Sequence, residues 1–465
     1  MQLWQEIIQW SLAAHALLIG GALLMLALTA NMLRQHRSPA ASAAWLLFML
    51  AVPYLGVPLY LLFGTRKVAA LHASKAPLFS GQPRIVPAGG DPAQRYLQQI
   101  GLPPAVGVDR VDFHADAGVA FDVLRTALRS AQRTIDVCMF ILADDGVGRE
   151  IIDILSERAR AGVRVRLLLD GVGSFLLPRR RLRPLLQAGG RVAWFVPVLH
   201  RPLRGRTNLR NHRKLVIADQ RQVWSGGRNL AFEYLGDEST TAWYDLSFDI
   251  SGDAVTVFGE LFDADWSFAT GEVLAVPPTR LPADAGAACI QAVPSGPDVA
   301  QDSLHDLLVT LIAGARQRVI LVSPYFVPDE VLQTLLRLAA RRGVRVDLVV
   351  PRRSNHRLAD IARARFVRQL DEAGANIWLL PDAMLHAKAI VIDDRYALAG
   401  SANLDLRSLF LNFELMTLFH GAAEVAQLTT WIDALRGRCE TWCPRPVGAV
   451  KETLEGLVLL AAFQL

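Results

Sequence analysis

The chain begins with two long apolar runs separated by a short basic segment. No Asp, Glu, Lys or Arg occurs in residues 7–33 or 38–65, so each run is long enough to cross a bilayer as a helix. The segment between them, residues 34–37, is too short for a domain. We therefore predict that residues 1–65 form a transmembrane α-helical hairpin with both ends on one side of the membrane. A cleaved signal peptide is disfavoured, because the first six residues lack Lys and Arg and a second apolar run follows.

The rest of the chain carries the same strand-helix-strand pattern twice. A Gly-Val-Arg-Val element that opens a buried strand recurs at an offset of 181 residues. Such patterning predicts βαβ units, and their duplication predicts two α/β domains related by a pseudo-twofold axis. The expected elements are strands at 134–141 and 162–170 around a helix at 148–161, then strands at 318–323 and 343–350 around a helix at 329–342.

Clusters of proline and glycine mark the predicted boundaries. Prolines accumulate between residues 273 and 302, where we place the joint between the two α/β domains. The C-terminal apolar segment is too short to span a membrane and is expected to lie at the interface or to pack on the hairpin. The predicted organisation is a hairpin at 1–65, a linker at 66–108, α/β domains at 109–275 and 276–445, and an apolar tail at 446–465.

Composition narrows the class of protein. Hydrophobic residues make up 52% of the chain, which is high for a soluble protein and fits a membrane segment. The net charge of +5 indicates an acidic partner, either nucleic acid or an anionic lipid surface, without choosing between them. The four cysteines have no His at zinc-site spacing beside them, so we expect no metal and no other cofactor.

Two copies of one polar motif carry the candidate chemistry. Each copy is a His-x-Lys-x4-Asp sequence followed by a Gly and an Asn, and the two copies are separated by 174 residues throughout. A single His-x-Lys has little specificity, whereas a duplicated set at fixed spacing is specific. The two sets are His212, Lys214, Asp219 and Asn229 in the first half, and His386, Lys388, Asp393 and Asn403 in the second.

The spacing within each motif predicts which side chains share a surface. If a strand begins at the motif, His and Lys point to the same side, and the apolar residues after Lys belong to a buried strand. Asp219 and Asp393 lie seven residues from their His, at Asp-Gln-Arg and Asp-Asp-Arg turns. We therefore expect these two carboxylates to hold turns and not to touch the substrate.

Two His, two Lys and two Asn supply what metal-free transfer of a phosphodiester needs: a nucleophile, an acid for the leaving alcohol and cations around the phosphate oxygens. A neutral imidazole nucleophile also needs its second nitrogen held by a carboxylate or a carbonyl. Glu414 is the candidate behind His386, and Asp245 is its counterpart behind His212. On the residues alone the two halves are equivalent, so either His could be the nucleophile.

The doubled motif resembles the phospholipase D superfamily, over residues 110–440, and further segments resemble bacterial cardiolipin synthases. The resemblance implies attack by one His on the phosphorus of phosphatidylglycerol, departure of glycerol, and displacement of the phosphohistidine by a second phosphatidylglycerol. By analogy, His212 would be the nucleophile and His386 the acid and then the base, in a multi-pass protein of the bacterial inner membrane. The segments are residues 295–297 (Ser-Gly-Pro), 323–328 (Ser-Pro-Tyr-Phe-Val-Pro), 403–408 (Asn-Leu-Asp-Leu-Arg-Ser) and 412–414 (Asn-Phe-Glu).

Further residues are candidates for binding the substrate. Residues 178–213 contain ten arginines and no acidic residue, which indicates either a solvated basic surface or a site for lipid phosphates. Ser401 offers a hydroxyl where the first half has Gly227, and Tyr325 lines the entrance unless it packs in the core. The arginines singled out are Arg201, Arg204, Arg206 and Arg210.

Other activities share the same catalytic groups. A superfamily nuclease would also favour a basic cleft, but the predicted hairpin and the scarcity of base-stacking aromatics near the arginines favour phosphatidylglycerol and anionic lipids over nucleic acid. A noncatalytic lipid-binding protein is disfavoured because both motifs are intact. Hydrolysis by water stays open as an alternative to transfer. The sequence leaves open the acyl preference, the side of the membrane that holds the site, and whether the chain forms a homodimer.

Overall fold

The structure is a computed structural model. It describes residues 19–30, 39–63, 90–197, 209–236, 243–274, 289–299, 301–444 and 446–459, and single residues 15, 32, 75, 78 and 79. These residues fall into two compact units. One lies within Met1–Val68, and the other comprises the described residues from Lys75 onward.

The first unit is a set of packed helices. Residues 19–30 are helical, and they are followed by α2 (Pro39–Ala51) and α3 (Pro53–Phe63). α2 ends where Pro53, which has no N–H to donate, begins the next helix. Leu28, Met32, Met49 and Tyr60 form a small buried cluster between the helices.

The helices of the first unit can be compared with the predicted transmembrane hairpin. Apolar helices pack against one another as a hairpin requires, but parts of both predicted spans lie outside the described residues. Within the described ranges, no helix has both the length and the apolarity needed to cross a membrane.

The first α/β domain contains a mixed sheet of seven strands in the order β2-β8-β7-β6-β3-β4-β5. β3, β4 and β5 pair in parallel, and the other neighbours pair antiparallel. The strands are β2 (Arg110–His114), β3 (Thr134–Met139), β4 (Arg164–Asp170), β5 (Arg191–Phe195), β6 (Leu215–Ala218), β7 (Gln222–Gly226) and β8 (Ser247–Ser251). The helices are α6 (Ala117–Ser130), α7 (Gly146–Arg160), η1 (Arg179–Leu182), α8 (Arg183–Gln187), α9 (Phe232–Leu235) and α10 (Val255–Thr270).

The second α/β domain contains nine strands in the order β1-β9-β17-β15-β14-β10-β12-β13-β18, with β11 and β16 forming a separate pair. The strands are β1 (Val106–Gly107), β9 (Cys289–Ser295), β10 (Arg318–Val322), β11 (Phe326–Val327), β12 (Arg345–Pro351), β13 (Asn376–Leu380), β14 (Ala389–Ile392), β15 (Tyr396–Gly400), β16 (Leu404–Asp405), β17 (Glu414–Phe419) and β18 (Glu440–Thr441). The helices are α5 (Pro92–Gln99), α11 (Ser303–Gly314), α12 (Glu330–Arg341), α13 (Arg357–Asp371), α14 (Leu406–Phe410), α15 (Ala422–Arg436) and α16 (Ala449–Leu459).

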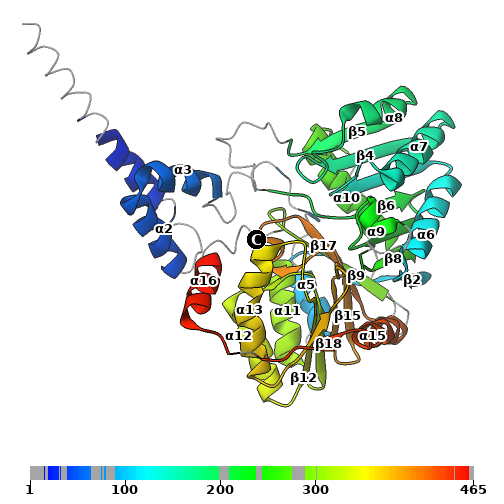
Figure 1. The fold of residues 1–465 in the computed structure, drawn as a ribbon. Coiled ribbons are helices and arrows are strands. Elements are labelled where there is room, and N and C mark those ends of the chain that lie inside the picture. Colours follow the sequence, from blue (N-terminus) through cyan, green and yellow to red (C-terminus); the bar gives the residue numbers. More distant parts are fainter. Residues whose placement is uncertain are drawn as a thin grey trace, which may run out of the picture. The chain divides into compact units, whose positions relative to one another are not determined.

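The two sheets repeat one topology. When the edge strands β1 and β18 are set aside, β9-β17-β15-β14-β10-β12-β13 matches β2-β8-β7-β6-β3-β4-β5 strand for strand. In each domain one long helix, α10 or α15, covers one face of the sheet, and several helices cover the other (Figure 1). The predicted α/β class and the duplication are therefore confirmed.

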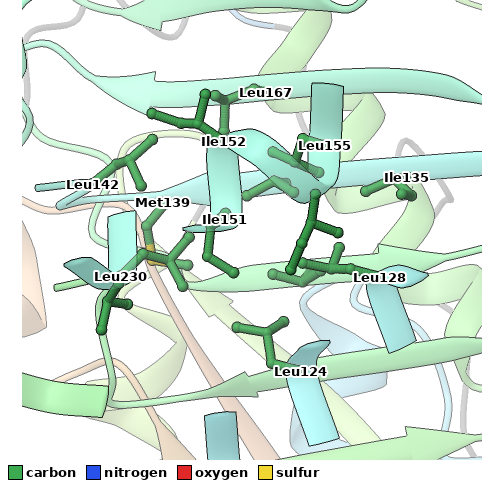
Figure 2. Packing of buried hydrophobic residues seen from close by; sticks show 14 of the residues in the cluster. Leu124, Leu128, Ile135, Met139, Leu142, Ile151, Ile152, Leu155, Leu167 and Leu230 are labelled. Carbon is green, nitrogen blue, oxygen red and sulfur yellow. The ribbon is translucent and has the colours of Figure 1, made fainter. Parts of the chain in front are cut away.

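The core of the first domain shows why its central strands are apolar throughout. Ile135 and Met139 on β3 and Leu167 on β4 lie among buried residues of α6 and α7 (Figure 2). Strands covered by helices on both faces have no solvent side, so their sequences form continuous apolar runs. α7 begins where Asp145 accepts a hydrogen bond from the N–H of Gly148, as an N-cap does.

Two predicted peripheral segments belong to the second domain. The plain linker predicted at 66–108 is wrong for residues 90–107, because α5 packs on α11 and β1 pairs with β9. The tail at 446–465 contains α16, which packs on α13, where Glu455 forms an ion pair with Arg368. Val458 and Leu459 of α16 also pack in one apolar cluster with Phe366 of α13, so apolar burial together with the ion pair holds this helix on the second domain.

Candidate active site

The two α/β domains join at their motifs, and the junction repeats itself. The N–H of His212 donates to the carbonyl of Phe413 at 2.8 Å, and the N–H of His386 donates to the carbonyl of Tyr244 at 2.6 Å. Each motif therefore runs beside a segment of the other domain, in parallel bridges at Asn211 and Leu385. This backbone pairing brings the two halves face to face, as a pseudo-twofold relation requires.

Each catalytic-type imidazole is held by a carboxylate from the opposite domain. His212 Nδ1 lies 2.9 Å from Glu414 Oε2, and His386 Nδ1 lies 2.6 Å from Asp245 Oδ2. The predicted pairing within each half is therefore wrong. The reason is the junction: Glu414 follows the segment that pairs beside His212, and Asp245 follows the segment that pairs beside His386.

The lysines lie beside their histidines, as the alternation of side chains predicts. Lys214 Nζ donates to the carbonyl oxygen of His212 at 2.8 Å. Lys388 Nζ lies 2.8 Å from Nδ1 and 3.1 Å from Nε2 of His386, and also donates to the carbonyl of that residue. β6 and β14 begin one residue after these lysines, and all of their residues are buried.

Burial sets the protonation of this site. Loss of hydration lowers the pKa of His212 to about 4, although Glu414 opposes the shift, and it lowers the pKa of His386 to about 3. Burial likewise lowers the pKa of Lys214 to about 7 and that of Lys388 to about 8. Each ammonium group lowers the pKa of the imidazole in the opposite motif, so the two motifs form one electrostatic site. At neutral pH both imidazoles are uncharged.

The two carboxylates stay ionised although they are buried. Burial alone would raise the pKa of Glu414, but His212 and Lys214 outweigh it and hold the value below the ordinary range. For Asp245, burial would likewise raise the pKa, but His386 and Lys388 outweigh burial and leave a pKa of about 2. Because each Nδ1 faces an ionised acceptor, each Nδ1 carries the proton, and Nε2 is left with its lone pair.

Ser401 hydrogen-bonds the carboxylate that holds His212. Its buried hydroxyl donates to Glu414 Oε2 at 2.5 Å and accepts from the N–H of Leu415 at 2.9 Å. Ser401 is thus placed to position Glu414, and the substrate-binding role predicted for it stays a prediction. Gly227 holds the equivalent place in the first half, where a Cβ would lie 2.1 Å from Asp245 Oδ1. Position 227 thus requires glycine, because a side chain there would clash with Asp245. Position 401, beside the longer Glu414, has room for a hydroxyl.

Asp219 and Asp393 hold turns away from the imidazoles. Both adopt positive φ values, +54° and +51°. Asp219 accepts hydrogen bonds from the backbone N–H groups of residues 132–134, and Asp393 accepts them from those of residues 316–318. These are the segments that lead into β3 and β10, so each motif carboxylate fixes the start of the strand that pairs with the strand of its own motif. The predicted turn role is confirmed.

Three more of the predicted site residues, Asn229, Asn403 and Tyr325, are described by the structure. Asn229 is buried, and its carboxamide oxygen accepts from the N–H of Ile141 at 3.2 Å. Asn403 is buried as well, beside Asp405. Tyr325 Oη donates to Asn355 Oδ1 at 2.5 Å. Burial raises the pKa of Tyr234, and the interaction with Tyr325 adds to that shift.

Aromatic rings flank both imidazoles, and sequence reasoning missed them. The ring of Phe140 meets that of His212 edge-on at 4.7 Å between centroids. Tyr234 and Trp243 lie 5.0 Å and 5.4 Å from the His386 ring. These rings exclude water from the imidazoles and so explain their low pKa values.

A buried cluster of charges, which we call the brace, lies behind the first motif. Arg213 Nη1 lies 2.8 Å from Asp265, and its Nη2 lies 3.1 Å from Asp298. Lys75 Nζ pairs with both carboxylates, at 2.6 Å in the case of Asp298. Arg213 Nε also donates to the carbonyl of Glu414. The brace therefore ties Lys75 to both domains and to the strand that holds Glu414.

Sequence reasoning missed the brace for identifiable reasons. Lys75 lies in the segment predicted as a linker, where a charged side chain is expected in solvent, and Asp265 gives no local signal on a helix. Arg213, the middle residue of its motif, was the one detectable sign, because Ala387 takes its place in the second copy.

Of the candidate arginines, the structure describes Arg210. Arg210 is buried, donates to the carbonyl of Val196 at 3.3 Å and lies 3.9 Å from Asp170. Burial lowers its pKa, and the Asp170 carboxylate opposes that shift. Arg201, Arg204 and Arg206 lie outside the described residues. Within the described part of the chain, no cluster of His, Cys, Asp and Glu could hold a metal ion.

The arrangement can carry out displacement at phosphorus. It presents two neutral imidazoles, each with Nδ1 anchored by a carboxylate, and two ammonium groups that can neutralise phosphate oxygens. Because all of these groups are buried among aromatic rings, their charges act in a medium of low polarity.

Comparison with known proteins agrees with this site. Residues 124–266 and 308–436 match the family described as cardiolipin synthase, PLD-like domain, and residues 23–64 match the family described as phospholipase D-nuclease N-terminal. Cardiolipin synthase A of Pseudomonas aeruginosa is 34% identical, covering 82% of this chain and 81% of that protein. Cardiolipin synthase of Halalkalibacterium halodurans is 30% identical, covering 92% and 88%.

One solved structure shares the fold. Phosphatidylserine synthase of Haemophilus influenzae superposes with a TM-score of 0.62 at 16% identity, covering 81% of this chain and all of that one. The family matches on both motif-bearing domains and the identity to relatives over most of their length assign the chain. The chain belongs to the cardiolipin synthase family of phospholipase D-like proteins.

Proposed function

We propose that the chain transfers the phosphatidyl group of one phosphatidylglycerol to a second one, producing cardiolipin and glycerol. The observation that carries the proposal is the crossed pair of imidazole-carboxylate contacts, which places two neutral imidazoles and two lysines in one buried site. The names of the relatives support the choice of lipid.

In the first step, Nε2 of one imidazole attacks the phosphorus. A P–N bond forms while the bond from phosphorus to the glycerol oxygen breaks, and the other imidazole gives its proton to that oxygen. The second imidazole has a low pKa in the empty site, but the negative charge of a bound phosphodiester favours its protonated form. Lys214 and Lys388 neutralise the phosphate oxygens.

In the second step, the same neutral imidazole removes the proton from a hydroxyl of the second phosphatidylglycerol. The oxygen attacks phosphorus, the P–N bond breaks, and cardiolipin leaves with the first imidazole restored. The two imidazoles thus have different tasks although they derive from one duplicated motif.

The surroundings favour His212 as the nucleophile. Lys388 Nζ lies close to both ring nitrogens of His386, whereas Lys214 donates to the backbone carbonyl of His212. An ammonium group beside Nε2 weakens an attacking lone pair, and it suits a nitrogen whose task is to pass a proton to and from an alcohol. This agrees with the family analogy.

A lipid assay tests the proposal. The full chain is reconstituted in vesicles with phosphatidylglycerol labelled in its headgroup glycerol, without added metal or nucleotide, and products are measured by mass spectrometry. We expect cardiolipin and one labelled glycerol per cardiolipin, and no product from His212→Ala. Phosphatidic acid as the main product would replace transfer by hydrolysis, and absence of both products would overturn the proposal.

We also propose that residues 1–65 anchor the chain in the bacterial inner membrane as a two-span hairpin. The charge-free runs, the packed apolar helices and the N-terminal family match support this. After expression in bacteria, the chain should stay in the membrane fraction after alkaline carbonate washing and be released by detergent. Release by carbonate alone would contradict an integral anchor.

A further inference from the structure

The loop after β4 presents apolar side chains to solvent beside the active site. Val172, Phe175 and Leu176 have exposed fractions of 44%, 65% and 87%. Single exposed apolar residues are common, but three within five positions form a patch that soluble surfaces rarely display. We call residues 171–177 the apolar tip.

Buried hydrogen bonds hold the base of the apolar tip in place. Asp170 Oδ1 accepts from the N–H groups of Val172 and Gly173, both at 2.9 Å. The hydroxyl of Ser174 donates to the carbonyl of Phe140 and accepts from the N–H of Leu142. The outward direction of the apolar side chains therefore results from a fixed turn.

The same bonds connect the apolar tip to the catalytic motif. Asp170 Oδ2 accepts from the N–H of Asn211 at 2.9 Å, one residue before His212. A Cβ on Gly173 would lie 2.2 Å from the carbonyl oxygen of Phe140, whose ring packs on His212. The tip thus stands one layer of residues away from the first imidazole.

Arginines follow the tip directly. Arg179, Arg180 and Arg183 are exposed, whereas Arg181 pairs with Asp144. No acidic residue occurs between 178 and 197. An apolar projection bordered by arginines matches the layers of an anionic bilayer, in which phosphates lie just outside the acyl chains.

The equivalent loop of the second domain lacks this combination. β12 corresponds to β4, and it is followed by Arg352, Arg353 and Ser354 without an apolar tip. The duplicated fold therefore does not require exposed apolar residues at this position.

We propose that the apolar tip and the arginines after it form a bilayer-docking surface. Val172, Phe175 and Leu176 enter the boundary of the acyl chains, and Arg179, Arg180 and Arg183 bind the phosphates of anionic lipids. This rests on the proposed function, since it supplies the route by which phosphatidylglycerol passes from the bilayer to His212. The bilayer is favoured over a protein partner because the charge and the apolar patch follow the order of its layers.

Catalysis in two physical forms of the substrate tests the proposal. The full-length Phe175→Ser/Leu176→Ser variant is compared with Leu338→Ser, a matched control because Leu338 is 47% exposed on α12. With vesicles, the apparent KM in mole fraction of phosphatidylglycerol should rise about tenfold or more in the tip variant. With short-chain phosphatidylglycerol dispersed as monomers, all three proteins should agree within about twofold.

The arginines are tested separately from the tip. Arg180→Gln should raise the apparent KM on vesicles about fivefold, and salt should reduce the difference from the unmutated chain. An unchanged value on vesicles would remove the headgroup contact from the proposal. An equal loss on monomeric substrate would show that the change acts on the fold of the site.

A label on the tip gives a measurement that does not depend on catalysis. Leu176→Cys and Leu338→Cys, each combined with Cys443→Ser, are labelled with a fluorophore and reconstituted as full chains in vesicles whose acyl chains carry bromine. Quenching at position 176 and not at 338 is expected. Equal quenching at both positions, or a tip variant whose only change is a loss of self-association in mass photometry, would overturn docking. Quenching at 176 without any cardiolipin from the unmutated chain would overturn the proposed function alone.

Discussion

The two catalytic motifs share a centre and differ in what surrounds it. In both, a neutral imidazole points its Nδ1 at a carboxylate of the other domain, and a buried lysine lies beside it. Around the first motif, Arg213 and Arg228 are buried where the second has Ala387 and Ala402. Arg228 donates to the carbonyls of His114, Ala115 and Tyr234, so it fixes backbone.

The carboxylates differ in length and in support. Glu414 receives hydrogen bonds from Ser401 and Asn412, whereas Asp245 accepts from the N–H of Leu246 and has Gly227 against it. This difference indicates that, after duplication, the groups expected to contact phosphorus were retained in both motifs, whereas the residues that position them diverged. Divergent supports permit a division of tasks between two identical side chains.

The largest expected effect comes from removing either imidazole. His212→Ala and His386→Ala should each reduce turnover of phosphatidylglycerol by about 10³-fold or more, because one loses the nucleophile and the other the proton donor. A phosphatidyl substrate with a p-nitrophenol leaving group separates the two tasks, since this group departs without a proton. Release of p-nitrophenol should recover in His386→Ala and stay absent in His212→Ala.

The readout for this first prediction is the p-nitrophenolate burst measured by stopped flow. Recovery in His212→Ala and none in His386→Ala would reverse the assignment of the two roles. Recovery in both would mean that neither imidazole is the nucleophile.

The second prediction tests the crossed pairing. Glu414→Gln should behave as a defect of His212, and Asp245→Asn as a defect of His386, each with a loss of about 10²–10⁴-fold, because an amide can no longer hold the tautomer that leaves Nε2 unprotonated. The leaving-group assay distinguishes them, since Asp245→Asn should be partly rescued by p-nitrophenol and Glu414→Gln should not. Rescue of Glu414→Gln alone would indicate pairing within each half.

These carboxylates show how much of the site could be predicted from the sequence. Glu414 and Asp245 could be identified from the sequence, because polar residues at the start of buried strands need a partner. The histidine that each carboxylate binds could not be identified, because the choice of domain depends on how the two sheets meet. That junction rests on backbone bonds such as His212 N–H to Phe413, which leave no sequence pattern.

The fold was more predictable than its connections. Continuous apolar runs and the repeated Gly-Val-Arg-Val element suffice for two α/β domains, since each repeat has the same hydrophobic period. Lys75 shows the limit. A lysine in a segment rich in proline and glycine is expected in solvent, but here it is buried between two carboxylates that are distant in sequence.

The third prediction concerns the brace, which the second motif lacks. Lys75→Met should lower the free energy of unfolding by about 3–5 kcal/mol, because it leaves Asp265 and Asp298 with one buried cation. Denaturant unfolding in detergent, followed by tryptophan fluorescence, measures this. Lys451→Met on the exposed face of α16 is the control and should change the value by less than about 0.5 kcal/mol.

Charge balance supplies the check on the brace. Lys75→Met/Asp298→Asn removes one charge of each sign and should recover part of the lost stability, since the remaining Arg213 and Asp265 stay paired. A double variant as unstable as the sum of the two single ones would mean that Lys75 stabilises by packing on Phe413.

The smallest expected effect is a difference in pH dependence between the motifs. Because burial lowers the pKa of Lys214 to about 7 and that of Lys388 to about 8, both ammonium groups lose their proton as the pH rises through this range. The loss of these two protons should therefore steepen the fall of kcat/KM, which reports the free enzyme, by about a further tenfold per unit between pH 7 and 8 and about a hundredfold per unit above pH 8, while kcat falls later because bound phosphate raises the pKa of both lysines. Between pH 5 and 7 kcat/KM should already fall by about tenfold per unit, since both imidazoles are neutral in the free enzyme and one of them must take up a proton as the phosphodiester binds. Lys214→Arg should remove the earlier part of the fall and Lys388→Arg the later part, because guanidinium keeps its charge throughout. A slope of kcat/KM that does not steepen up to pH 9.5 in the unmutated chain would show that neither lysine titrates in this range, and an identical shift in both variants would show that the two motifs share one titration.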